Sequence, residues 1–285
     1  MTAVSRQSLE EILRFYADAG VDDALDEIAT DRFQTGPVRA AQAQDVPARE
    51  DAPAGRSFER PAAPPVAPAL RQPPAATVPD EAQAALAREL ARKADSLEEL
   101  REIMAGFDGC NLKFTAKNFV FADGNPNGPL MLVGEAPGRE EDLEGLPFVG
   151  RSGKLLDRML AAIGLSRQTS AYIANVIPWR PPGNRTPTPH ETEICRPFIE
   201  RQIELANPAV LVTLGGPSAK VVLNATEGVL KLRGNWRVHT TASGKQIPTM
   251  PTLHPAYLLR NPAHKRLAWR DFLEVKAKLR EAGRL

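Results

Sequence analysis

From residue 80 to the last residue, short apolar segments with strand character alternate with segments of helical periodicity. This alternation constrains the fold most, because apolar strands separated by helices form parallel sheets that helices cover on both faces. We expect strands at Asn118–Ala122, Leu130–Val133, Ala171–Ile177, Val210–Leu214, Trp236–His239 and Ile247–Leu253. We expect two helices that begin at capping boxes: one from Ser96 and Glu99 to Gly106, and one from Thr188 and Glu191 to about Ala206. We expect three more at Ser152–Ile163, from beyond Gly215-Gly216 to about Leu223, and at Lys265–Ala282. The predicted class is α/β, with ligands bound beyond the carboxyl ends of the strands.

The composition divides the chain into three parts. Residues 1–30 carry apolar side chains at helical spacing and predict a short helical N-terminal element. Residues 31–79 are rich in proline and alanine, with ten prolines from Pro37 to Pro79 and no apolar period, which predicts a disordered linker. Residues 80–285 would then form the compact domain. The N-terminal helix either docks a repair or replication partner or packs back on this domain.

The net charge of +1 conceals a basic C-terminal quarter. Residues 231–285 hold 12 basic and 3 acidic side chains, a net charge of +9. Such a surface suits a polyanion, because neutralised phosphates release their counterions. A solvated lysine-rich helix would give the same count, so charge alone leaves both readings open.

Cysteine usage and apolar runs bear on the compartment. Two cysteines exclude a disulfide scaffold and fit a reducing environment. No run of eighteen apolar residues occurs, and the first residues lack the pattern of a signal peptide. We therefore expect a cytoplasmic, nucleoid-associated bacterial protein without a membrane span.

The loop Gly134–Asp142 follows the strand at Leu130–Val133. Its glycines let the backbone approach a ligand, and its amide groups can point into a cavity. Glu135, Glu141 and Asp142 crowd carboxylates at the strand end, where one could hold a water or act as a base. An ordinary acidic turn is the alternative.

Two further residues have side chains suited to a planar base. Phe148 stands between Gly145 and Gly150 and offers either a core side chain or a flat face for stacking. Asn175 lies near the carboxyl end of its strand, and its amide presents one donor and one acceptor. This pair matches the edge of a pyrimidine, although a buried structural asparagine would look the same.

Two loops supply residues that fit a nucleic acid. Prolines stiffen Trp179–Arg185, from which Arg180 and Arg185 can reach phosphates. The second loop, Leu253–Pro262, precedes the basic C-terminal helix.

In that second loop, His254 at a strand end can donate a hydrogen bond to an oxygen that develops negative charge. Leu258 and Leu259 are apolar residues in basic surroundings, typical of a wedge that enters a base stack, and Arg260 would hold the backbone beside them. Taken alone, a histidine before a proline is more often structural, but all five features lie at one edge of the predicted sheet.

Four motifs together resemble the family 4 uracil-DNA glycosylases. They are Gly-Glu-x-Pro-Gly, Pro-Phe-Val-Gly, Arg-Pro-Pro-x-Asn-Arg and His-Pro-Ala-Tyr-Leu-Leu-Arg-Asn-Pro, in the family's order, and the resemblance spans residues 107–281. It implies the three-layer αβα sandwich of these enzymes, with a central four-stranded, mainly parallel sheet. The implied function is a monofunctional, monomeric glycosylase that hydrolyses the N-glycosidic bond of a flipped-out deoxyuridine, releasing free uracil and starting base excision repair. A non-catalytic protein that binds uracil-containing or abasic DNA is the alternative.

The resemblance also assigns roles to residues. Glu135 would position the attacking water, Asn175 would read the uracil edge and His254 would stabilise the departing uracil anion. Phe148 would stack on uracil and Glu141 would help to exclude the methyl group of thymine. The implied uracil-binding set is Gly134, Glu135, Ala136, Glu141, Phe148, Asn175 and His254. The implied DNA-binding set is Arg180, Asn184, Arg185, Leu258, Leu259 and Arg260.

One departure concerns a cofactor. Members of the family usually hold an iron–sulfur cluster on four cysteines, whereas here Lys113 and Trp179 occupy two of those positions. Cys110 and Cys195 are what remains of the ligand pattern, and two thiolates are too few for a four-iron cluster. We therefore predict that the protein has no cluster and no other cofactor, with the two cysteines as packing residues or a redox-labile pair.

Overall fold

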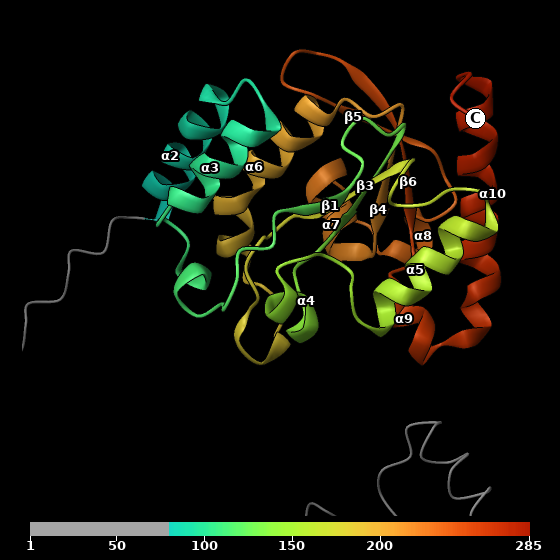
Figure 1. The fold of residues 1–285 in the computed structure, drawn as a ribbon, viewed down its shortest axis with the longest axis horizontal. Coiled ribbons are helices and arrows are strands. Elements are labelled where there is room, and N and C mark those ends of the chain that lie inside the picture. Colours follow the sequence, from blue (N-terminus) through green and yellow to red (C-terminus); the bar gives the residue numbers. More distant parts are fainter. Residues whose placement is uncertain (1–79) are drawn as a thin grey trace, which may run out of the picture. The chain divides into compact units, whose positions relative to one another are not determined.

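A six-stranded sheet organises residues 80–285, the part of the chain that the computed structural model describes (Figure 1). The N-terminal element and the linker predicted for residues 1–79 lie outside it. The strands are β1 (Ala122–Gly124), β2 (Leu130–Gly134), β3 (Ala171–Asn175), β4 (Val210–Leu214), β5 (Arg237–Thr240) and β6 (Gln246–Thr252). Their order is β1-β3-β2-β4-β6-β5, in which β3, β2, β4 and β6 are parallel and the two edge strands run antiparallel.

Helices cover both faces of this sheet. On one side lie α2 (Asp80–Lys93), α3 (Leu97–Gly106), α6 (Pro189–Ala206) and α7 (Gly216–Leu223), and on the other α5 (Arg151–Ala162) and α10 (Lys265–Glu281) (Figure 1). The shorter elements are η1 (Asn111–Phe114), α4 (Arg139–Glu144), η2 (Pro182–Asn184), α8 (Val229–Leu232), α9 (Pro255–Arg260) and η3 (Pro262–His264). The layered α/β fold is therefore confirmed.

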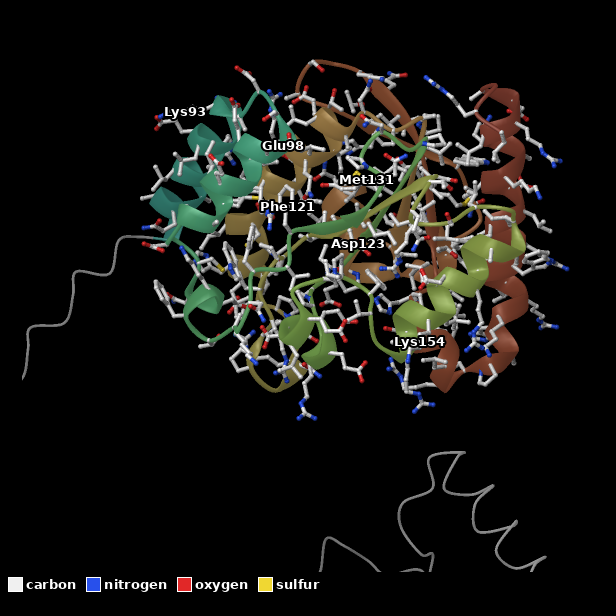
Figure 2. The ribbon with its side chains drawn as sticks, in the orientation of Figure 1. Lys93, Glu98, Phe121, Asp123, Met131 and Lys154 are labelled. Carbon is white, nitrogen blue, oxygen red and sulfur yellow. The ribbon has the colours of Figure 1, made fainter. Side chains whose placement is uncertain are left out.

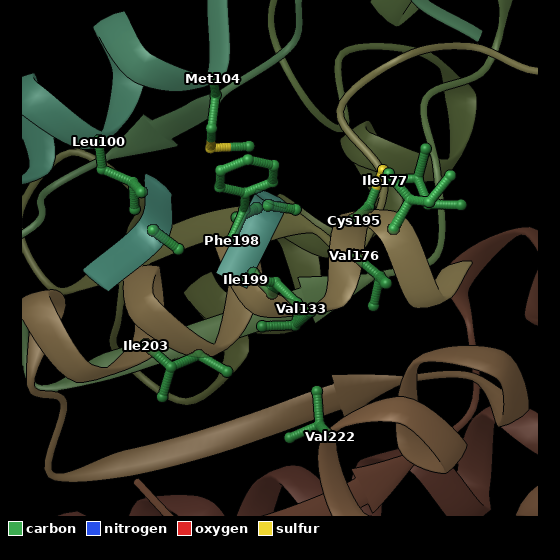
Figure 3. Close-up of a cluster of buried hydrophobic side chains, with 14 of the residues drawn as sticks. Leu100, Met104, Val133, Val176, Ile177, Cys195, Phe198, Ile199, Ile203 and Val222 are labelled. Carbon is green, nitrogen blue, oxygen red and sulfur yellow. The ribbon is translucent and has the colours of Figure 1, made fainter. Parts of the chain in front are cut away.

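The strand β2 shows why its sequence produces three layers. Alternate side chains of a strand point to opposite faces. Met131 and Val133 pack in the cluster of α2, α3 and α6, part of which Figure 3 shows, while Leu130 and Leu132 pack against α5 and α10. Because both faces are buried, the strand is apolar throughout rather than alternating, as in other covered parallel sheets.

The predicted helices, which correspond to α3, α5, α6, α7 and α10, and the four parallel strands were placed within a few residues, including the caps at Ser96 and Thr188, whereas α2 and α8 were not predicted. The expected strand at Asn118–Ala122 is wrong, because the edge strand begins only at Ala122. The backbone amide of Asn118 instead binds Asp142, and that of Val120 donates to the carbonyl of Pro178. The four strands that the resemblance implies match the parallel centre alone, while the strand expected at Trp236–His239 is the edge strand β5, shifted by one residue.

Two short helices, α4 and α9, occupy stretches that the sequence analysis treated as loops. Both follow a strand within a few residues at the same edge of the sheet, and α9 has a proline at its first position, which favours a helix start. None of the helices within residues 80–285 is long and apolar enough to cross a membrane.

Candidate active site

A cavity of about 510 Å³ opens at the carboxyl ends of the parallel strands. Its walls come from the segments that follow β2, β3, β4 and β6, four stretches that are distant in the sequence. The predicted site residues that line it are Glu135, Ala136, Glu141, Phe148, Asn175, Asn184, Arg185, His254 and Arg260. The sheet topology therefore brings most of the predicted residues together.

Gly134, the last residue of β2, sets the spacing inside this cavity. A Cβ atom at this position would lie 2.3 Å from Oδ1 of Asn175 and 2.7 Å from the Phe148 ring. Only glycine leaves both side chains in place. Gly134 thus serves the site through the absence of a side chain.

Asn175 ends β3 and is 5% exposed. Its Oδ1 is buried and has no hydrogen-bond partner among the described residues. A buried polar atom without a partner is costly and rare in folded proteins. The oxygen is therefore an acceptor available to a ligand with an N–H group.

The ring of Phe148 also lies in the cavity wall. Its centroid is 5.5 Å from that of His254, with 30° between the ring planes. The backbone of Phe148 adopts φ = +54°, in the left-handed region that bulky residues rarely occupy. The ring thus reaches the cavity at the expense of backbone strain.

His254 caps the N-terminus of α9. Its Nδ1 accepts a hydrogen bond from the backbone N–H of Ala256 at 3.1 Å, so the neutral ring carries its proton on Nε2. Burial, together with the positive charge of Arg260 and against the opposing effect of Glu141, lowers the pKa of His254 to about 4. At neutral pH the residue is an uncharged donor.

The three crowded carboxylates have different surroundings. Those of Glu141 and Asp142 are bound to backbone N–H groups: Glu141 accepts from Gly138, Val149 and Gly150, and Asp142 from Lys117 and Asn118.

Glu135 differs from both. Its carboxylate has no hydrogen-bond partner within residues 80–285, and burial raises its pKa. Of the three, Glu135 is therefore the one available to a water or a substrate.

Ion pairs to α4 and α6 hold the polar loop after β3. Arg180 donates through Nε to Oδ1 of Asn184 at 2.7 Å and lies 3.7 Å from Asp142. Arg185 binds Glu191 through two nitrogens at 2.6 and 2.9 Å, which holds the pKa of Glu191 at about 2. Arg180 does not line the cavity, whereas Asn184 and Arg185 form part of its rim.

The three residues of α9 that were predicted to contact DNA differ in their exposure. Leu258 is 1% exposed and packs with Leu253 and Ala268, Leu259 is half-buried, and Arg260 is exposed. Leu258 therefore anchors α9 to the domain instead of standing on its outer surface.

The two cysteines lie in the helical layer, away from the cavity. Their Sγ atoms are 3.9 Å apart, both side chains are fully buried, and Trp179 packs nearby against Phe119. The ammonium group of Lys113 donates to the carbonyl of Ala105 and to Asp108.

These residues do not fit a four-iron cluster. Two thiolates in direct contact leave no room for iron between them, and the chain has no third cysteine. No group of three or more potential metal ligands occurs in the described part of the chain.

The fold and the cavity define an α/β protein with a cavity at the carboxyl ends of a parallel sheet, lined by an aromatic ring and by polar side chains. Residues 121–273 match the Uracil DNA glycosylase superfamily. The chain belongs to this superfamily and, within it, to the type-4 uracil-DNA glycosylases, as the four motifs indicated.

Three relatives document this membership. The type-4 uracil-DNA glycosylase of Thermotoga maritima is 39% identical over 196 residues, which cover 65% of this chain and 98% of that protein. The enzyme of Sulfurisphaera tokodaii is 39% identical over 64% of this chain and 84% of its own length. That of Archaeoglobus fulgidus is 40% identical over 64% of this chain and 92% of its own length.

Sequence reasoning missed one residue beside the site, Arg167. It lies in the turn between α5 and β3, is 7% exposed, and bonds to the backbone on both sides of Phe148. A single arginine between a helix and a strand carries no signal that separates it from a surface residue. Only the contacts in the folded chain identify it.

Proposed function

We propose that this protein is a monofunctional uracil-DNA glycosylase that cleaves the N-glycosidic bond of a flipped-out deoxyuridine, leaving an abasic site. The observation that carries the proposal is the unpartnered Oδ1 of Asn175 in a cavity that also holds Phe148 and His254. An acceptor, a stacking ring and a neutral donor around one space form a site for a pyrimidine that has left the helix. Membership of the type-4 enzymes supports the same reaction.

Asn175 reads the edge of the base. Its Oδ1 accepts from N3–H of uracil, and its amide NH₂ donates to O4. Cytosine presents the reverse pattern at these two positions, an acceptor at N3 and a donor at N4. Because a mismatched partner would leave the buried amide unsatisfied, this contact discriminates against cytosine.

His254 stabilises the charge of the leaving base. Cleavage of the bond moves negative charge onto uracil while the sugar becomes oxocarbenium-like, so a donor at O2 binds the transition state more strongly than the ground state. The Nε2–H that the Ala256 contact leaves free is suited to this bond. Because the imidazole is neutral at pH 7, no proton has to be transferred for the stabilisation to operate.

Glu135 holds the attacking water. Its carboxylate is the one of the three that no backbone amide engages, and it lies in the cavity wall. A carboxylate at this place can also offset the positive charge on the sugar. Its ionised form is the active one in either case.

Glu141 contributes to the wall that faces the base. Three backbone amides hold its carboxylate and join the loop after β2 to the loop of Phe148. A fixed side chain in the wall is suited to excluding the additional methyl group of thymine. We assign Glu141 this steric role and no part in proton transfer.

Duplex DNA would approach over α9 and the loop after β3. The target nucleotide must leave the stack before its glycosidic bond is accessible. Leu259 and Arg260 occupy the outer side of α9 and would fill the gap and hold the backbone, with Leu258 as their buried support. Asn184 and Arg185 at the rim would contact the flanking strand, although the bond from Arg185 to Glu191 leaves less of its charge for phosphate.

We further propose that this enzyme contains no iron–sulfur cluster. The contact between Cys110 and Cys195, together with the apolar packing of Trp179, would link the segments that cluster ligands would otherwise join. Lys113 would close the same region through its bonds to the backbone and to Asp108. The reaction described above requires no metal.

The test is the formation of alkali-labile sites in oligonucleotides with U:G, U:A or single-stranded uracil. Asn175→Ala should lower kcat/KM by about a hundredfold, because the buried edge of the base loses its partner. Asn235→Ala removes an asparagine that bonds only to nearby backbone outside the cavity, and it should leave kcat/KM unchanged. If the wild-type protein bound uracil-containing DNA but formed no alkali-labile sites, the proposed glycosylase activity would be refuted and the non-catalytic alternative supported.

A further inference from the structure

The left-handed backbone of Phe148 requires an explanation in its surroundings. A bulky residue keeps φ = +54° only where neighbouring groups hold it against relaxation to a negative φ. The ring would leave the cavity wall if the backbone relaxed. What fixes the two peptide groups beside Phe148 therefore fixes the shape of the site.

Arg167 binds both of these peptide groups. Its Nη1 donates to the carbonyl of Pro147 at 3.2 Å and its Nη2 to the carbonyl of Phe148 at 2.8 Å. These carbonyls belong to the peptide groups immediately before and after the Cα atom of Phe148. One planar guanidinium thus sets the orientation of both planes that define φ and ψ of this residue.

The second of these peptide groups is also held from its other side. The N–H of Val149 donates to Oε1 of Glu141 at 3.1 Å, while the carbonyl of the same peptide group accepts from Arg167. Gly153 completes the arrangement, because a Cβ there would lie 1.7 Å from the Phe148 carbonyl oxygen. The peptide group is therefore bound at its oxygen and at its nitrogen.

Two carboxylates orient the guanidinium itself. Asp157 of α5 accepts from Nε at 2.8 Å, and Asp123 of the edge strand β1, labelled in Figure 2, accepts from Nη1 at 2.7 Å. A buried guanidinium needs such partners to compensate its charge. With all three nitrogens bonded and 7% of the residue exposed, Arg167 has one available orientation.

We propose that Arg167 is a positioning residue for the stacking ring of Phe148, an inference that rests on the proposed glycosylase function. Arg167 does not line the cavity, so its effect on the reaction passes through Phe148. Weakening its hold releases the ring from the wall and removes the stacking surface. The turn between α5 and β3 is thereby part of the base-recognition apparatus.

Single-turnover cleavage of a U:G oligonucleotide by Arg167→Lys tests this inference. Lysine keeps the charge but cannot span two carbonyls and two carboxylates, so kcat/KM should fall about tenfold, the size of a lost stacking contact. The same substitution made in the Phe148→Ala protein should lower kcat/KM by less than about twofold, because the ring it positions is already gone.

Arg201→Lys is the matched control. Arg201 also binds a backbone carbonyl through two nitrogens and pairs with a carboxylate, at Ala94 and Glu204, but it lies outside the cavity. It should lower the unfolding temperature without changing kcat/KM. Asp157→Asn is a milder second variant, because that carboxylate is 49% exposed, and it should cost about threefold in kcat/KM, again only when Phe148 is present.

The outcomes separate the two proposals. Absence of cleavage by the wild-type protein would overturn the glycosylase function. An active wild-type protein whose Arg167→Lys and Asp157→Asn variants keep full kcat/KM would overturn the role of Arg167 alone. Equal losses in the Phe148 and Phe148→Ala backgrounds would do the same, since the effect would then not pass through the ring.

Discussion

The cavity at the carboxyl ends of the parallel strands and the region around the two cysteines differ in how their side chains are satisfied. In the cavity, the Oδ1 of Asn175 and the carboxylate of Glu135 are kept from partners within the described chain, and Phe148 is held in a strained backbone. Around Cys110 and Trp179 the side chains are fully buried and packed against other apolar groups. The cavity therefore retains polar groups without partners among the described residues, whereas the side chains of the cysteine region contact one another and apolar neighbours.

This difference predicts whether a substitution should change the reaction rate or the free energy of unfolding. A change in the cavity should reduce the rate and leave the fold stable, because the lost interaction is made mainly with the substrate. A change around the cysteines should reduce the free energy of unfolding and leave the rate of the folded molecule intact. Substitutions that violate this division would show that the two regions are coupled.

Trp179→Ala should give the largest effect. The side chain is 1% exposed and contacts Phe119, so its removal should lower the free energy of unfolding by about 3–5 kcal/mol. Denaturant unfolding measures this loss, and kcat at a temperature well below the transition should match the wild type. A folded variant with a much reduced kcat would contradict the separation of the two regions.

The carboxyl-end position of the cavity residues follows from sequence reasoning, because parallel strands fix which loops meet. Glu135 and His254 follow strands that were predicted correctly, Asn175 ends another, and the structure places all three in one cavity. What those residues bind in the cavity remains a prediction from the sequence and the site.

Other features depend on contacts that no local pattern records. The amides of Val149 and Gly150 that bind Glu141 and the two carbonyls that bind Arg167 lie between 8 and 20 residues away from those side chains along the chain. Leu258 shows the same difficulty in reverse: an apolar residue in a basic stretch suggested a wedge, and it is a buried anchor. Which residues of a helix as short as α9 are buried cannot be deduced from composition.

His254→Ala should lower kcat by about 10²–10³-fold, the usual cost of removing one donor that stabilises an oxyanion. His239→Ala provides the comparison, because His239 is also buried and bonds through Nδ1 to the carbonyl of Val222, outside the cavity. That variant should lose stability and keep kcat. Single-turnover rates with excess enzyme distinguish them, and equal rates for the two variants would refute the role of His254.

The acid limb of the pH–rate profile should belong to Glu135. Burial raises its pKa above the ordinary value of 4.5, and the ionised form is the active one, so kcat should fall about tenfold per pH unit below that pKa. His254, with a pKa of about 4, is still neutral where protonation of Glu135 begins, so the onset of the limb should belong to Glu135. In Glu135→Gln the rate should be lower and the limb absent. A limb that persists unchanged in that variant would reassign it to another group.

Replacement of both cysteines by alanine should have the smallest effect. Each loss of a buried sulfur removes a methyl-sized volume from a packed core, so the pair should cost about 1–2 kcal/mol in the free energy of unfolding. The rate should be unchanged, because neither sulfur lies in the cavity.

The purified wild-type protein should also lack stoichiometric iron and visible absorbance, and dialysis against a chelator should alter neither its unfolding temperature nor its activity. The prediction would be refuted if the wild-type protein bound iron in stoichiometric amount and the double cysteine variant lost both the iron and the activity. Activity in the cavity would then depend on a metal held by the cysteine region.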